Sequence, residues 1–182
     1  MVPLTALWLP ILLSAVFVFI ASFILHMLIK PWHKGDYQKA PTDSALSAAI
    51  DIPSGQYMVP WCDWSTMTPE ERKAKMGQPM AMMLVRNPPP SFPGTLGVWF
   101  LFCLIVSFVV GYLASVTINP GAAYLHVHRV VATAAFLTYS LGGFPDSIWY
   151  GRPWRIAFKD VIDGLIYAML TGGTFGWLWP AA

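Results

Sequence analysis

Apolar residues occur in long runs along this chain, and polar residues gather in the segments between them. A helix needs about 20 apolar residues to cross roughly 30 Å of hydrocarbon. Runs of this length occupy about residues 4–29, 95–118 and 160–180, and a weaker run occupies 127–146, which is diluted by Tyr139, Ser140, Gly142 and Gly143. The pattern predicts an all-α polytopic membrane protein with four transmembrane helices, forming one domain over residues 1–182.

The composition favours the same class of protein. Of the 182 residues, 56% are hydrophobic and only 11% are charged, whereas soluble domains carry about 25% charged residues. The first run has no basic segment before it and exceeds the apolar core of a secretory signal, so we expect it to remain in the mature protein.

Basic residues predict the orientation in the membrane. Four spans place residues 30–94 and 147–159 on one side, which then holds ten of the 11 lysines and arginines: Lys30, Lys34, Lys39, Arg72, Lys73, Lys75, Arg86, Arg152, Arg155 and Lys159. Only Arg129 lies on the other side. The positive-inside rule makes the first side cytoplasmic and both termini periplasmic. A net charge of +2 gives no indication of nucleic-acid binding.

The cytoplasmic loop, residues 30–94, is about 65 residues long and rich in proline. We expect short helices at 42–50 and 68–77, the second with a capping box formed by Thr68 and Glu71. The stretch GQYMVPW (55–61) is expected to be extended, and the methionine-rich stretch 79–85 is a candidate surface for a partner or the bilayer.

Small residues recur every four positions in two of the predicted spans. Helices in lipid approach closely where side chains are small, so these ridges predict packing within the bundle or against another subunit. The ridge of the fourth span consists of Gly164, Ala168, Gly172 and Gly176, and that of the third consists of Ala134, Thr138 and Gly142.

Aromatic and arginine side chains mark the predicted membrane interfaces, where amphipathic rings and snorkelling cations anchor helices to lipid. The candidate anchors are Trp8, Trp99, Trp149, Arg152, Trp154, Arg155, Trp177 and Trp179.

Candidate chemistry is sparse. His126 and His128 share a face only in an extended segment, because two positions along a helix diverge. They and His26 are weak candidates for ligating a haem or chlorin, and interfacial hydrogen bonding is the more frequent role. Asp160 and Asp163 are expected in the first turn of the fourth helix, where its dipole favours carboxylates. No catalytic or phosphate-binding motif is present, so we predict no enzyme activity, no metal site and no cofactor.

The segments FLTYSLGGFPDSIWYGRPW (136–154), DGLIYAMLTGGTFGWLWP (163–180) and LWLPILLSAVFVFIASFILHM (7–27) resemble small uncharacterised bacterial inner-membrane proteins. The resemblance implies a four-helix fold in the inner membrane and no assigned activity.

Three functions fit this pattern. The first is an accessory subunit of a larger membrane complex, with photosynthetic or respiratory assemblies as candidate hosts. The second is a homo-oligomeric solute transporter or channel, with a pore lined by Ser107, Thr138, Tyr139, Thr171 and Thr174. The third is a haem- or pigment-binding protein that uses His126 or His128. The small-residue ridges and the absence of charge at the predicted membrane centre favour the first function, with other integral subunits and lipid as partners.

Overall fold

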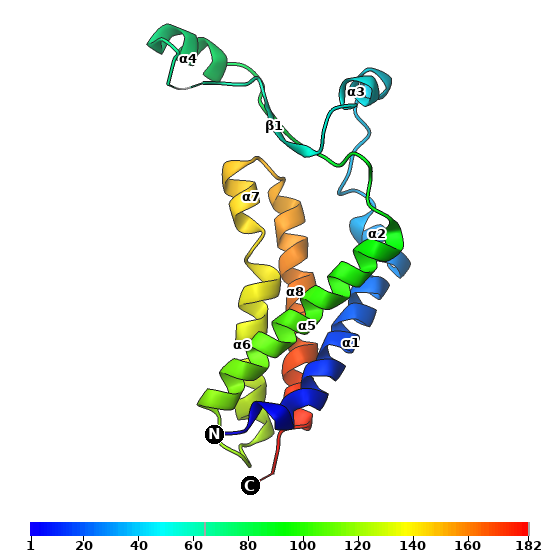
Figure 1. Cartoon of the computed structure of the whole chain (residues 1–182), viewed down its shortest axis with the longest axis vertical. Coiled ribbons are helices and arrows are strands. Elements are labelled where there is room, and N and C mark those ends of the chain that lie inside the picture. The colour runs from blue at the N-terminus through cyan, green and yellow to red at the C-terminus, as the bar shows by residue number, and fades with distance from the viewer. Residues whose placement is uncertain (64, 182) are drawn as a thin grey trace. The chain divides into compact units, whose positions relative to one another are not determined.

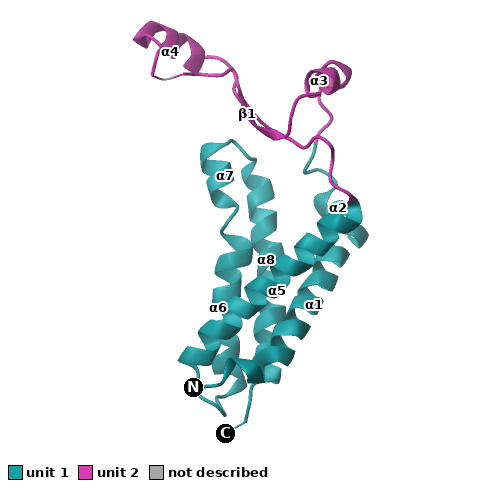
Figure 2. Ribbon diagram, in the orientation of Figure 1, with its two compact units in different colours: residues 1–37, 92–182 teal, residues 38–91 magenta. Residues whose placement is uncertain are grey.

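The computed structural model describes residues 1–63 and 65–181, and it is mostly helical, with 65% of its residues in helices (Figure 1). The chain divides into two compact units, of which unit 1 comprises residues 1–37 and 92–182 and unit 2 comprises residues 38–91 (Figure 2). Each unit has its own secondary structure.

Unit 1 is a bundle of four long helices with short helices at their ends. Its elements are η1 (Leu4–Leu7), α1 (Trp8–Phe23), the wide turn η2 (Ile24–Leu28), α2 (Lys30–His33), α5 (Phe92–Thr117), α6 (Tyr124–Ser140), α7 (Phe144–Trp149) and α8 (Trp154–Trp177). The helices α1, α5, α6 and α8 run antiparallel in chain order along the bundle (Figure 1). The most extensive contact joins α6 and α8, and α1 packs against both α5 and α8.

Hydrogen bonds hold both chain ends at one end of this bundle. The backbone N–H of Val2 donates to the carbonyl of Ser115 (3.1 Å), near the C-terminus of α5. The N–H of Gly121 in the α5–α6 turn donates to the carbonyl of Pro180 (2.9 Å). The helix α2 and the N-terminus of α8 lie at the opposite end (Figure 1).

Two helices of the described chain are long and apolar enough to cross a membrane by themselves, Leu4–Leu28 and Phe92–Thr117. The helix α6 has 17 residues, about 26 Å at 1.5 Å per residue, which is shorter than the hydrocarbon core. The helix α8 has 24 residues but carries Arg155, Lys159, Asp160 and Asp163 in its first half. The four predicted spans therefore differ in length and in charge, and two of them meet the criteria for crossing a membrane by themselves.

The ends of the third and fourth predicted spans were wrong by about six residues. The helix α6 ends at Ser140 rather than near 146, because two glycines, which are poor helix formers, follow it and Pro145 instead begins the separate helix α7. The helix α8 begins at Trp154 rather than 160, directly after Pro153. Asp163 therefore lies in the third turn of α8, where the dipole of the first turn does not explain it.

Unit 2 contains α3 (Asp43–Ala49), β1 (Gly55–Val59), α4 (Pro69–Met76) and β2 (Ala81–Val85). The two strands pair antiparallel, with Gly55 opposite Val85 and Val59 opposite Ala81. The capping box of α4 is present, since Thr68 accepts from the Glu71 backbone and the Glu71 carboxylate accepts from the Thr68 N–H. None of the described residues of unit 2 is buried, so its secondary structure has no hydrophobic core of its own.

Candidate functional site

A group of polar side chains gathers at the end of the bundle formed by η2, α2 and α8. We call it the polar cluster; it consists of His26, Trp32, His33, Asp36, Lys159 and Asp163. Its members come from two segments more than 120 residues apart in the chain, and the two segments meet inside unit 1.

The local backbone brings the two histidines together. His26 lies in the wide turn η2, where the N–H of Ile29 donates to the carbonyl of Ile24 five residues earlier (3.0 Å). Such turns often occur at functional sites because they redirect side chains. Pro31 then lies in the first turn of α2, where a proline is tolerated. The rings of His26 and His33 consequently stack, with centroids 4.2 Å apart and planes 14° apart.

His33 lies between two carboxylates. Its Nδ1 is 2.7 Å from Asp36 Oδ2, and its Nε2 is 3.0 Å from Asp163 Oδ2. Each carboxylate has a second partner: Lys159 Nζ donates to Asp36 Oδ1 (2.6 Å), and the indole N–H of Trp32 donates to Asp163 Oδ1 (2.8 Å). Each of the four carboxylate oxygens therefore has a nitrogen within hydrogen-bonding distance, as burial of these groups requires.

Burial and pairing oppose each other at Asp36. Its side chain is only 6% exposed, and burial by itself raises the pKa of the carboxyl, but hydrogen bonds from Lys159 and His33 outweigh it and lower that pKa below its ordinary 3.8. When His33 carries both ring protons, the two carboxylates are balanced by two cations, Lys159 and His33. With His33 in that form, the polar cluster is a nearly neutral network that joins α2 to α8.

Two arginines extend this network outward. Arg152 pairs with Asp160, with Nη1 and Oδ2 2.5 Å apart, and Arg155 donates to the carbonyl of Gly35. Beside them is a cavity of about 330 Å³, lined among others by His26, His33, Asp36, Arg152 and Asp160. Both arginines were predicted as lipid anchors, and the structure places them in contacts within the protein.

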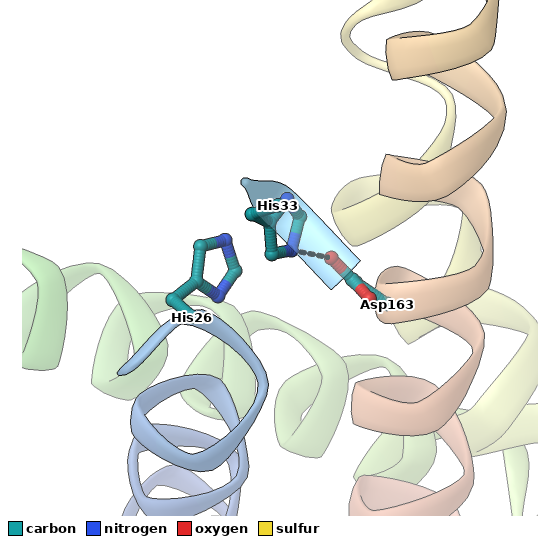
Figure 3. A group of neighbouring side chains, drawn as sticks. All are labelled: His26, His33 and Asp163. Carbon is teal, nitrogen blue, oxygen red and sulfur yellow. Dashed lines mark hydrogen bonds and ion pairs between the residues drawn. The ribbon is translucent and has the colours of Figure 1, made fainter. Parts of the chain in front are cut away.

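Three members of the polar cluster could bind a metal ion. His26, His33 and Asp163 each offer one ligand atom, and these atoms lie within 4.8 Å of one another (Figure 3). The sequence pattern did not group these residues, because Asp163 was expected at a helix terminus. The signal that could have found them is the positive-inside pattern, which places KPWHKGD (30–36) and KDVID (159–163) on the same side.

His126 and His128 do not converge. Both lie in the first turns of α6, where His126 is exposed and His128 is half-buried. The ring of His128 stacks on Tyr124 with centroids 5.7 Å apart, and its buried Nδ1 has no hydrogen-bond partner in the described structure. Within the described residues, neither histidine belongs to a group of three or more metal-ligating side chains.

The ridge of α8 faces α6. A Cβ added at Gly164 would lie 2.8 Å from the backbone of Tyr139, and one at Gly172 would lie 2.7 Å from Ala132 Cβ. At Gly176 it would lie 2.8 Å from the ring of Tyr124, and Ala168 is buried. The ridge predicted on the third span differs: Ala134 is half-buried and Thr138 is exposed, while Gly142 lies beyond the end of α6 and is exposed.

The predicted tryptophan anchors divide into two sets. Trp8, Trp149, Trp154 and Trp177 are exposed. The other two make hydrogen bonds through the indole N–H, Trp99 to Ser22 Oγ (2.8 Å) and Trp179 to the carbonyl of Asn119 (3.0 Å).

The predicted pore-lining residues do not form one outer face. Ser107, Thr171 and Thr174 are buried inside the bundle, Tyr139 is half-buried, and Thr138 is exposed. Ser107 accepts a hydrogen bond from Ser14 Oγ at 3.0 Å, which joins α1 to α5.

Comparison of the chain with family models, curated proteins and solved structures finds no match. The resemblance to small bacterial inner-membrane proteins therefore stays a prediction.

Proposed function

We propose that this chain is a non-catalytic integral membrane protein, an accessory subunit that uses unit 2 to bind another subunit of a bacterial inner-membrane complex. The observation that carries the proposal is that unit 2 has ordered elements and no buried residue among those described. Folding such a segment costs conformational entropy that its own contacts do not offset. A partner surface would supply the missing burial.

The exposed side chains of unit 2 suit a protein partner. Trp61 is 70% exposed, Leu84 is 75% exposed and Met80 is 64% exposed. Aromatic residues and methionine are enriched at protein interfaces, and a few of them usually supply most of the binding energy. The partner we propose is therefore a subunit with an apolar cytoplasmic surface.

Four membrane crossings, the finer part of the proposal, are supported by pairing of the charges on α8. Unpaired charges are costly in hydrocarbon, but Lys159 and Asp163 are bonded within the polar cluster and Asp160 is paired with Arg152. The glycines of α8 allow α6 to pack closely along it. In this proposal the shorter helix, α6, crosses the membrane in contact with the longer helix, α8. An even number of crossings also agrees with both chain ends lying at one end of the bundle.

With four crossings and the orientation that the positive-inside rule predicts, unit 2 and the polar cluster are cytoplasmic and both termini are periplasmic. Thr138, which is exposed on α6, and Gly142, which is exposed in the turn after it, then offer small residues to a helix of another subunit, in addition to the contact made by unit 2.

The test is isolation of the natively expressed, tagged protein in mild detergent, followed by identification of co-purifying proteins. We expect a larger complex in fixed stoichiometry. Trp61→Ser combined with Leu84→Ser should weaken the association by about 30-fold or more, the effect of losing about 2 kcal/mol at an interface. Lys73→Ser with Gln78→Ser, which changes exposed polar residues of the same unit, is the matched control.

Recovery of the wild-type chain only as a monomer or homo-oligomer would contradict the proposal. If that homo-oligomer moved a solute in liposomes, the transporter function would replace it.

A further inference from the structure

We propose that His26, His33 and Asp163 bind one divalent first-row transition metal ion. The proposal is independent of the subunit function, because it rests on the polar cluster of unit 1 and not on unit 2. Three observations carry it: the convergence of the three ligand atoms, the partners that hold each ligand, and the cavity beside them.

The ligand atoms are close to the spacing that one ion requires. Metal bonds to imidazole nitrogen and carboxylate oxygen are about 2.1 Å long, so two ligands of one ion lie at most about 4.2 Å apart. The three atoms lie within 4.8 Å of one another, and His33 Nε2 and Asp163 Oδ2 are already 3.0 Å apart. His26 approaches from the side (Figure 3), and because it is exposed, a small rotation brings it into range.

Each of the three ligand side chains has a hydrogen-bonding partner at the atom that faces away from the other two ligand side chains. His26 Nδ1 lies 3.0 Å from the carbonyl of Ser22, which leaves its Nε2 available. His33 Nδ1 lies 2.7 Å from Asp36 Oδ2, and Asp163 Oδ1 accepts from the indole of Trp32 at 2.8 Å. Metal-binding histidines usually donate their second ring N–H to a carbonyl or carboxylate in this way, which orients the ring.

The ligand set indicates the class of ion. Two imidazoles and one carboxylate suit zinc and iron(II), whereas magnesium and calcium prefer oxygen ligands alone. The ion would bind the lone pair of His33 Nε2 and Asp163 Oδ2, and any proton on that nitrogen is released to solvent. The cavity of about 330 Å³ adjoins His26 and His33 and has room for a water molecule to complete the coordination.

The experiment uses the full chain in mild detergent, with Cys62→Ser as background and a tag that contains no histidine, since a free thiol in unit 2 could bind metal by itself. The protein is analysed for metal as isolated, stripped with a chelator and titrated with Co²⁺, whose visible absorption reports its ligands. Zn²⁺ is then added in competition. We expect one equivalent of Co²⁺ to bind and Zn²⁺ to displace it.

Three variants separate metal binding from folding. His26→Ala should abolish stoichiometric Co²⁺ binding without changing thermal stability, because the His26 side chain is exposed. Trp32→Phe keeps an aromatic ring but removes the indole N–H that donates to Asp163, and it should weaken binding by about 10- to 100-fold, the usual effect of losing an outer partner. His126→Ala changes an exposed histidine outside the cluster and should bind as the background protein does. Absence of Co²⁺ and Zn²⁺ binding in the background protein, or equal binding in His26→Ala, would overturn the proposal.

Discussion

Replacement of Gly172 by alanine tests how closely α8 packs against α6. A Cβ at this position would lie 2.7 Å from Ala132 Cβ and 2.9 Å from the backbone oxygen of His128. Neither atom belongs to a flexible side chain, so one of the helices must move. Overpacking of this kind costs about 1–3 kcal/mol.

The neighbouring glycine provides a matched control. A Cβ at Gly173 would meet only the hydroxyl of Tyr124, at an ordinary 3.6 Å. Gly172→Ala and Gly173→Ala change helix propensity equally, by up to about 1 kcal/mol in favour of alanine, so the difference between the two variants isolates the steric cost. At about 2–4 °C per kcal/mol for a chain of this size, Gly172→Ala should melt about 2–12 °C below Gly173→Ala.

The assay is thermal unfolding of the two variants in the same detergent, followed by the loss of the monodisperse peak in size-exclusion chromatography. Gly172→Leu should reduce accumulation of folded protein further. Equal midpoints for Gly172→Ala and Gly173→Ala would refute the close packing of α8 on α6.

Two further predictions concern topology and the polar cluster. A reporter that is active only in the cytoplasm should give signal when inserted after Gly77 and none when fused to the C-terminus, and the reverse pattern would refute the proposed orientation. Lys159→Met leaves the buried Asp36 carboxylate without its cation and should cost about 3 kcal/mol, the low end for breaking a buried pair, whereas Lys39→Met breaks an exposed pair at 3.9 Å and should cost at most about 0.5 kcal/mol. Because the pKa of Asp36 lies below 3.8 in the folded protein, its carboxylate contributes fully at neutral pH and loses its effect only as the pH falls below that value. The stability lost in Asp36→Asn should therefore persist from pH 8 to pH 5, and a loss that disappears by pH 5 would contradict the assignment.

The helical regions could be predicted from the sequence because long apolar runs depend on local composition alone. The capping box at Thr68 and Glu71 and the extended stretch that became β1 are also local patterns, and both were confirmed. The limits of α6 and α8 were wrong because hydropathy falls gradually near Gly142 and Asp160, while helix limits depend on backbone features such as Pro145 and Pro153.

The polar cluster could not be predicted from local pattern. Asp163 was expected to be a carboxylate stabilised by the helix dipole, because the helix was predicted to begin at 160. Its partners Trp32 and His33 lie 131 and 130 residues away in the chain. Lys159 precedes Asp163 by four residues, the spacing of an ion pair along a helix, but it bonds Asp36 of a distant segment instead. Contacts of this kind follow from tertiary packing, to which single-sequence periodicity is insensitive.

Photo-crosslinking in living cells tests the proposed role of unit 2 most directly. A photoreactive amino acid at Leu84, which is 75% exposed, should crosslink to one discrete membrane protein, while the same probe at Lys73 should give little or no such product. Crosslinks from position 84 to lipid alone, or to a second copy of this chain alone, would contradict the account of the protein as a subunit of a larger complex.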